Sequence, residues 1–169
     1  MRRRALAFLV GVHCLGTSVL AGEGKIRVGD SFPSFKLPYL YAKKSFDGSQ
    51  LKGKIAVIDF WGSDCPPCRE AVPELNSIAK EFHKKSVIVL GINVDENEKD
   101  TRAFLEEFKP QYPLLDDGKH RFVPKMGIEL MPTTYLVDRA GKVRFINKGF
   151  KSGDIEKIRA AILKALSAK

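Results

Sequence analysis

Apolar residues form two nearly continuous runs in the middle of the chain, with an amphipathic stretch between them. The runs lie within residues 54–61 and 86–94, as expected of strands that are covered on both faces of a sheet. From Pro66, apolar side chains recur every three or four residues, which predicts a helix that buries Val72, Leu75, Ile78, Ala79 and Phe82. The order of strand, helix and strand predicts parallel pairing with a right-handed crossover. Pro73 should kink the helix.

Residues 100–124 change from a regular to a broken pattern. Phe104 and Phe108 lie one helical turn apart, and they predict an amphipathic helix over residues 100–108. Prolines then interrupt the chain at positions 110, 113 and 124, and proline lacks the N–H that helices and central strands use. We therefore expect an irregular segment before the next strand.

The last part of the chain predicts a hairpin and a helix. Residues 133–137 and 143–146 are expected to be its two strands, joined by the turn residues 138–141. The helix that follows carries one apolar stripe to pack on the sheet, made of Ile155, Ile158, Ile162 and Leu166.

Residues 28–53 are rich in Pro, Gly and Ser and contain only short apolar pairs. This composition predicts an extended lead-in to the first buried strand, with one hairpin at Asp47-Gly48. No internal repeat or low-complexity tract stands out. Residues 22–169 are therefore expected to form one domain, and a chain of this size buries roughly 70% of its unfolded surface.

The N-terminal segment has the features of a targeting sequence. Three arginines at positions 2–4 precede an uncharged, mostly apolar stretch at 5–21, and Val19 and Ala21 suit cleavage after residue 21. The stretch could also remain as a short membrane anchor. Cys14 lies within it and would leave with a cleaved signal. We expect an exported protein, in the periplasm or at the outer face of the cytoplasmic membrane.

Basic residues exceed acidic residues by 29 to 20, so the formal net charge is +9, and it falls to +6 without residues 1–21. The lysines are scattered among acidic residues, and no aromatic-basic module for nucleic acid is visible. The composition favours an ordinary solvated surface and predicts no nucleic-acid partner. Attraction to an anionic membrane surface stays open.

The candidate chemistry lies at Cys65 and Cys68, directly after the first buried strand and at the start of the helix. Free N–H groups and a partial positive charge at a helix start favour the thiolate, which is the reactive form of cysteine. Cys68 falls on the same helical face, within reach of Cys65. The pair can therefore close into a disulfide after Cys65 has attacked another one.

A Cys-x-x-Cys sequence could instead be half of a zinc site, which normally has four ligands. The other candidate ligands are Cys14 and three isolated histidines, at positions 13, 83 and 120, without a ligand-like spacing. The sequence therefore predicts redox chemistry with no metal and no cofactor other than the disulfide, and an inert structural disulfide is the alternative. In an oxidising compartment a reactive dithiol also needs an outside source or sink of electrons, so a redox partner is implied.

Several motifs together resemble the thioredoxin superfamily, and specifically its exported TlpA/ResA/CcmG-type branch. They are Asp59-Phe60-Trp61, Cys65-Pro66-Pro67-Cys68, Pro73 and Met131-Pro132-Thr133-Thr134. The resemblance covers nearly all of residues 22–169 and implies an α/β thioredoxin fold, with a central mixed sheet flanked by helices. The lead-in from residue 28 and the long segment at 95–127 resemble the N-terminal extension and the central insertion of that branch.

The resemblance implies that Cys65 is the exposed nucleophile and Cys68 the buried resolving thiol. Asp59 matches a buried acid that accepts or donates the proton of Cys68, because desolvation raises its pKa. The alternative is a strand-end aspartate paired with some other group. Pro132 resembles the cis-proline that faces the disulfide, beside backbone that pairs with an extended substrate, and Met131 would border the active site.

Three further residues are expected at the substrate surface. Pro66 and Pro67 stand between the cysteines, where they also tune the reduction potential. Trp61 could be a lid over the cysteines, although a single tryptophan after a buried strand is as readily core packing.

Two positions depart from thioredoxin. Asp64 stands before Cys65, where tryptophan is common, and a carboxylate there disfavours the thiolate unless it is solvated. Gly91 stands where thioredoxin keeps a lysine near its buried acid, so Asp59 would lack that partner. The sequence leaves open whether the pKa of the Cys65 thiol is raised or lowered overall.

The sequence thus predicts an exported, monomeric thiol-disulfide oxidoreductase. The branch implies that it reduces exported cysteine-containing proteins, such as a cytochrome c precursor, with electrons from a membrane thiol reductase. One alternative is a binding module in which Cys65 and Cys68 form a permanent disulfide. A second is a thiol peroxidase, but the Pro-x-x-x-Thr/Ser-x-x-Cys pattern of peroxiredoxins is missing, since neither cysteine has a proline seven places before it.

Overall fold

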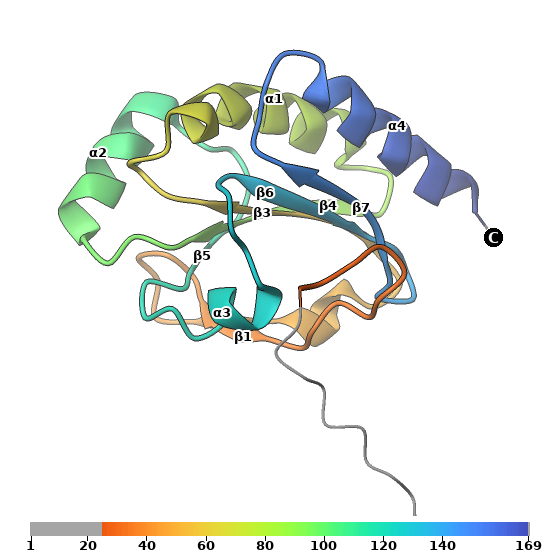
Figure 1. Ribbon diagram of the computed structural model, residues 1–169, viewed down its shortest axis with the longest axis horizontal. Coiled ribbons are helices and arrows are strands. Elements are labelled where there is room, and N and C mark those ends of the chain that lie inside the picture. The colour runs from red at the N-terminus through yellow and green to blue at the C-terminus, as the bar shows by residue number, and fades with distance from the viewer. Residues whose placement is uncertain (1–24, 169) are drawn as a thin grey trace, which may run out of the picture.

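The computed structural model describes residues 25–168, so the predicted signal or anchor at 5–21 and Cys14 lie outside the described residues. Five strands form one sheet in the spatial order β5-β4-β3-β6-β7 (Figure 1). They are β3 (Ile55–Trp61), β4 (Val87–Asn93), β5 (Leu114–Asp116), β6 (Thr133–Val137) and β7 (Val143–Lys148). β4 runs parallel to β3 and β5, whereas β6 runs antiparallel to β3 and β7, so the sheet is mixed as predicted.

The sheet is covered on both faces. Helices α1 (Pro66–Phe82), α2 (Glu98–Phe108) and α4 (Asp154–Ser167) lie on one side of it, and α3 (Val123–Met126) lies with the N-terminal lead-in on the other (Figure 1). This is the arrangement of the thioredoxin fold that the sequence predicts, with the lead-in and the α3 part of the central insertion covering the second face.

Strand β3 is buried along its whole length because it is central and both faces are covered. One set of alternating side chains packs on the α3 side: Ala56, Ile58 and Phe60. The other set, beginning with Ile55 and Val57, packs against α1 and α4. Because side chains alternate along a strand, Asp59 and Trp61 also lie on the helix side.

Helix α1 begins at Pro66 as predicted. Cys65 is its N-cap, and Pro66 and Pro67 occupy the first helical positions. Proline is tolerated there because the N–H groups of the first turn make no hydrogen bond within the helix. The helix buries the predicted positions Val72, Leu75, Ile78 and Phe82. Pro73 lies inside the helix, and the kink expected there stays a prediction.

Helix α2 begins two residues before the predicted start. The Asn97 side chain caps it by accepting a hydrogen bond from the Lys99 N–H at 3.0 Å. Glu98 and Asp100 in the first turn complement the positive end of the helix dipole. This turn is polar, so the apolar pattern could not reveal it.

The hairpin expected at Asp47-Gly48 is wrong. The antiparallel pair consists of β1 (Lys36–Pro38) and β2 (Ser45–Asp47), and its turn lies between them. Asp47 instead caps a short 3-10 helix, Gly48–Leu51, by accepting the Ser49 N–H at 2.9 Å. Gly48 is needed because a Cβ there would lie 2.9 Å from the Phe35 ring.

The segment expected to be irregular contains two short elements, β5 and α3. The buried carboxylate of Asp117 holds the turn before α3, since it accepts hydrogen bonds from the N–H groups of Arg121, Phe122 and Val123. The Phe122 ring then packs on Phe35, with 5.0 Å between ring centroids. Elements of three or four residues show no periodicity, so the sequence did not reveal them.

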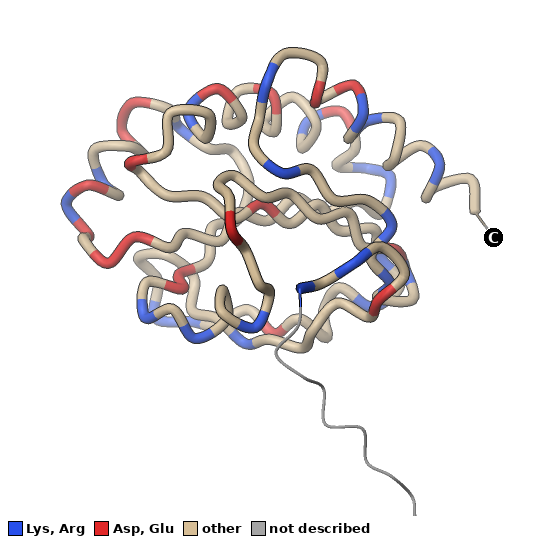
Figure 2. The backbone as a smooth tube through the Cα atoms, viewed as in Figure 1, with Lys and Arg blue, Asp and Glu red and all other residues tan. Residues whose placement is uncertain are grey.

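The predicted C-terminal hairpin and helix are present, and α4 buries Ile155, Ile158 and Ile162. Basic and acidic residues are interspersed along the described chain, in agreement with the scattered charge read from the sequence (Figure 2). Within residues 25–168, no helix is long and apolar enough to cross a membrane.

The anchoring of the insertion by Asp117 can be tested by Asp117→Ala. We expect the free energy of unfolding to fall by about 2–3 kcal/mol, because several buried N–H groups lose a charged acceptor. Urea denaturation measures this value, and Lys119→Ala, at an exposed position in the same turn, serves as the control with a change within about 0.5 kcal/mol. Equal effects of the two substitutions would contradict the anchoring role.

Candidate active site

The loop between β3 and α1 is held in place by Asp95, which follows β4. The Ser63 N–H donates to Asp95 Oδ1 at 2.9 Å. Asp95 Oδ2 accepts hydrogen bonds from Asn93 Nδ2 at 2.9 Å and from Thr101 Oγ1 at 2.8 Å. A Cβ at Gly62 would lie 3.0 Å from Asp95 Oδ1, so glycine suits this close approach. The loop that presents Cys65 is thus tied to both β4 and α2.

Cys65 and Cys68 form a disulfide, with 5.2 Å between their Cα atoms. The two cysteines are not equivalent, because Cys65 is partly exposed whereas Cys68 is only 1% exposed. The Cys68 N–H donates to Cys65 Sγ at 3.2 Å, so the sulfur of Cys65 takes the capping position at the helix start. N–H groups and the helix dipole at this position stabilise a thiolate on Cys65 once the disulfide opens.

Asp59 is buried on the helix side of β3 and is 2% exposed. Its Oδ1 accepts a hydrogen bond from Thr134 Oγ1 at 2.7 Å, and Thr134 is its direct partner across β3 and β6. Burial raises the pKa of Asp59 to about 7, although the hydrogen bond from Thr134 lowers it. At neutral pH this carboxyl group therefore exchanges readily between its protonated and ionised forms.

Trp61 lies in the core beside the disulfide. Its ring stacks on Phe104 at 4.6 Å between centroids and belongs to one buried cluster with Cys68 and Val72. Because only 2% of the residue is exposed, it offers almost no surface to a bound protein. Of the two interpretations read from the sequence, core packing describes Trp61, and an exposed lid does not.

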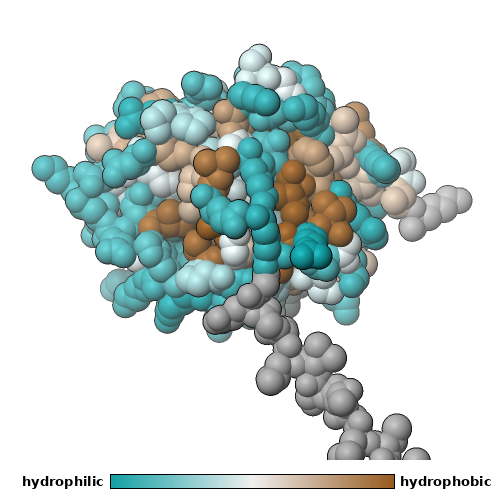
Figure 3. Space-filling view, viewed as in Figure 1, coloured by the Kyte–Doolittle hydropathy of each residue, from teal (hydrophilic) through white to brown (hydrophobic). Residues whose placement is uncertain are grey.

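The segment leading into β6 borders the disulfide. The Met131-Pro132 peptide bond is cis, and Met131 packs against the cluster that contains Cys68. The preceding residue, Leu130, is 53% exposed. On the face drawn in Figure 3, apolar residues lie on both sides of a central hydrophilic strip, and the segment leading into β6 crosses the middle of the same view in Figure 1.

The remaining predicted surface residues flank the cysteines. Pro66 is exposed and Pro67 half-buried. Asp64 is exposed, so its carboxylate is solvated and its effect on the neighbouring sulfur is screened. Arg69 closes the loop from the helix side, since its Nη2 donates to the Ser63 carbonyl oxygen at 3.4 Å.

Three residues that hold the site in place were not predicted from the sequence as site residues. Thr134 is part of the motif at residues 131–134, but the sequence assigned it no role. Asp95 follows the end of a predicted strand, and a polar residue at that place is a signal of a functional position. Tyr112 gave no signal at all. Burial raises the pKa of Tyr112 well above its usual value, and the negative charge of Asp59 adds to this effect.

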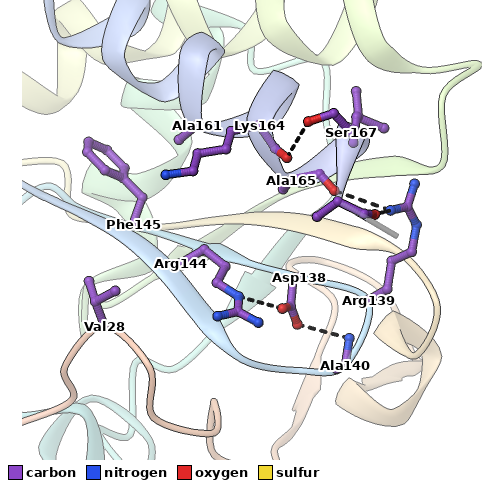
Figure 4. Close-up of a pocket in the computed structure, with 12 residues that line it drawn as sticks. Val28, Asp138, Arg139, Ala140, Arg144, Phe145, Ala161, Lys164, Ala165 and Ser167 are labelled. Carbon is purple, nitrogen blue, oxygen red and sulfur yellow. Dashed lines mark hydrogen bonds and ion pairs between the residues drawn. The ribbon is translucent and has the colours of Figure 1, made fainter.

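A pocket of about 1030 Å³ lies away from the disulfide, between α4, β7 and the turn before β7 (Figure 4). Its polar groups are mostly bonded to one another. Arg144 pairs with Asp138 at 2.6 Å, and Arg139 donates to the carbonyl oxygens of Ala165 and Ala168 at the end of α4. None of its lining residues belongs to the disulfide site.

Residues 25–168 contain no group of three or more His, Cys, Asp or Glu side chains that could hold a metal ion. The described site consists of the Cys65–Cys68 disulfide at a helix start and the buried carboxyl group of Asp59 on the preceding strand.

Comparison with known proteins agrees with this geometry. The sequence model of the AhpC/TSA family matches residues 28–146. The chain belongs to this family. The AhpC/TSA match spans the lead-in, the cysteine pair, the central insertion and most of the final hairpin.

Relatives of this family member include a thiol-disulfide oxidoreductase ResA of Bacillus cereus, which is 28% identical over 144 residues, covering 83% of each chain. ResA of Bacillus subtilis is 29% identical over 131 residues, covering 78% of this chain and 73% of the relative. A crystal structure from Chlorobium tepidum, assigned as a thiol:disulfide interchange protein DsbE, superposes with a TM-score of 0.79 at 31% identity, covering 85% of this chain and all of that one.

These similarities identify the protein as a thiol-disulfide oxidoreductase of the thioredoxin superfamily.

The raised pKa of Asp59 predicts how stability depends on pH. The carboxyl group titrates near 3.8 in the unfolded chain and at about 7 in the folded one, so its contribution is complete below about pH 4 and is lost as the pH rises to 7. Relative to Asp59→Asn, the free energy of unfolding of the wild type should fall by about 1.4 kcal/mol for each pH unit in this window. Urea denaturation of the oxidised proteins at several pH values measures the difference, and a difference independent of pH would refute the prediction.

Proposed function

We propose that the protein is exported and reduces disulfides in exported cysteine-containing proteins through its Cys65–Cys68 dithiol. The observation that carries the proposal is the asymmetry of the pair: Cys65 is accessible at a helix start, whereas Cys68 is buried beneath it. An accessible thiolate can meet a large substrate, and a buried neighbour can attack only the sulfur next to it.

The first step is attack by the Cys65 thiolate on one sulfur of the substrate disulfide. A bond forms between Cys65 Sγ and that sulfur, the substrate disulfide breaks, and the other substrate sulfur leaves as a thiolate. The helix N-terminus at Cys65 stabilises the attacking anion.

The second step closes the disulfide of the enzyme. Cys68 gives its proton to the ionised Asp59, and the resulting thiolate attacks Cys65 Sγ, which releases the second substrate thiolate. Two electrons have then passed from the dithiol to the substrate. The role of Asp59 is supported by its burial and by a pKa of about 7, which suits a proton carrier at neutral pH.

The direction of electron flow and the partners are proposed from the resemblance to the TlpA/ResA/CcmG branch. A reductase in an oxidising compartment must be recharged, and we propose a membrane thiol reductase as its electron donor. A cytochrome c precursor is the proposed substrate. Pro66 and Met131 are proposed to contact it, because Pro66 is exposed beside Cys65 and Met131 packs against the cluster that contains Cys68. Pro132 itself is buried, so we propose that the backbone beside it pairs with the substrate.

The decisive experiment is covalent trapping with Cys68→Ser. Without its resolving thiol, the protein should accumulate as a mixed disulfide between Cys65 and its substrate in the exporting cell. Mass spectrometry of the isolated adduct identifies the substrate. Cys65→Ser/Cys68→Ser is the matched control and should trap nothing. A folded Cys68→Ser protein that yields no adduct would overturn the proposal.

The redox state of the wild-type protein separates this proposal from a non-catalytic binding module. Rapid alkylation in the cell should find a substantial fraction of Cys65 and Cys68 as free thiols, because the cycle passes through the dithiol form. A pair that is always oxidised would favour the binding module.

Sequencing the N-terminus of the same material determines whether cleavage follows residue 21.

A further inference from the structure

The indole N–H of Trp61 is a buried hydrogen-bond donor without a partner. Trp61 is 2% exposed, and its Nε1 atom has no hydrogen bond to any group in residues 25–168. Buried polar groups in folded proteins are almost always paired, so an unpaired one calls for an explanation. The sequence contains a single tryptophan, and it stands two residues after Asp59 on the same face of β3.

The position of this N–H is defined by Gly91. In the register of the sheet Gly91 is the direct partner of Asp59 on β4. A Cβ at Gly91 would lie 3.0 Å from Trp61 Nε1 and 3.1 Å from the Tyr112 ring. The indole nitrogen therefore lies over Gly91, on the strand next to Asp59, and neighbouring strands are about 4.8 Å apart. Only glycine leaves room for it there.

Within the described part of the chain, no cation compensates the charge of Asp59. The groups that shift its pKa are its burial and the Thr134 hydroxyl from β6, and the Tyr112 phenol is the other titratable group that senses its charge. From α1, Cys68 contributes a disulfide sulfur to the Trp61 cluster, and α2 contributes the apolar Phe104. The ionised carboxylate therefore has one hydroxyl donor and needs another.

We propose that the Trp61 N–H is a second hydrogen-bond donor to Asp59, used when the carboxylate is ionised, and that Gly91 is the residue that admits it. The inference rests on the proposed role of Asp59 as the acceptor of the Cys68 proton. With Asp59 protonated the indole has no anion to bind. When Asp59 ionises, its free oxygen takes the N–H, and the carboxylate is then ready to receive the proton that Cys68 loses in the resolving step. Trp61 is thus a positioning residue that acts through Asp59.

The wild-type protein allows a direct test, since its one tryptophan gives one indole N–H signal in a ¹H–¹⁵N spectrum. In the oxidised protein this signal should shift between pH 5 and 9 with a midpoint at about 7, as Asp59 ionises. The shift should be absent in Asp59→Asn. An indole signal that does not respond to pH in the wild type would overturn the inference, without any substitution at Trp61.

Kinetics test the consequence for the reaction. A chromogenic nitrobenzoate disulfide releases one thiolate when Cys65 attacks and a second when Cys68 resolves the mixed disulfide, so the two steps are seen separately. Trp61→Phe keeps an aromatic ring on Phe104 and removes the N–H. We expect the pH midpoint of the second release to rise by about one pH unit, with the first release unchanged. Thr134→Val, which removes the observed donor, should raise it similarly.

Phe104→Leu is the matched control, because it disturbs the same ring packing and leaves the N–H in place. It should leave the midpoint of the second release unmoved, and an equal shift would show that packing alone is responsible. Suppose that the second release no longer depends on pH in Asp59→Asn, while Trp61→Phe has the pH midpoint of the wild type. The role of Trp61 is then refuted and the role of Asp59 stands. If Asp59→Asn keeps the wild-type midpoint, the role of Asp59 fails together with that of Trp61.

Discussion

The complete burial of β3 is the constraint on which the rest of the site depends. As the central strand it is covered by helices on one face and by the lead-in and insertion on the other, so no residue between Ile55 and Trp61 meets solvent. A carboxyl group placed on such a strand must lose its hydration, which favours its neutral form. A short loop, residues 62–65, joins the same strand to α1 and ends at Cys65. The buried acid and the partly exposed cysteine are therefore positioned by consecutive segments of the chain.

The loop that follows β3 positions Cys65 at the start of α1. Asp95 holds the backbone at Ser63, and the helix start then offers its N–H groups to Cys65 Sγ. Cys65 thus lies partly exposed at the helix start, while Cys68 is buried one turn into the helix. The proposed division of labour between two chemically identical side chains follows from these positions, because a helix start stabilises an anion.

Among the described residues, Asp59 has one observed hydrogen-bond donor, the Thr134 hydroxyl, and no counter-ion shifts its pKa. The lysine that thioredoxin keeps near its buried acid has no equivalent at Gly91, where Leu114, Tyr112 and the Trp61 indole fill the space. A lysine would favour the ionised carboxylate by direct attraction, whereas burial here raises the pKa of Asp59 to about 7 and the hydrogen bond from Thr134 only partly opposes it. The pocket at α4 and β7 differs in this respect, since its arginines are bonded to Asp138 and to helix carbonyls (Figure 4).

The sequence by itself determined the elements whose signals are local. Strands β3 and β4 are nearly continuous apolar runs, α1 has a helical period, and Cys65 and Cys68 stand together at the predicted start of that helix. Short or polar features were missed or misread for the opposite reason. β5 and α3 are too short to show a period, and Asp47-Gly48 fits a helix cap as well as a hairpin.

Only the tertiary structure decided the surroundings of Asp59. Thr134 and Gly91 lie far from it in the chain and reach it through the register of neighbouring strands, and Tyr112 is brought near from the segment before β5. The burial of Trp61 likewise depends on Phe104 from α2. Periodicity tells which face a side chain takes on its own element. It does not tell which residue lies opposite, because that is set by how the strands and helices pack together.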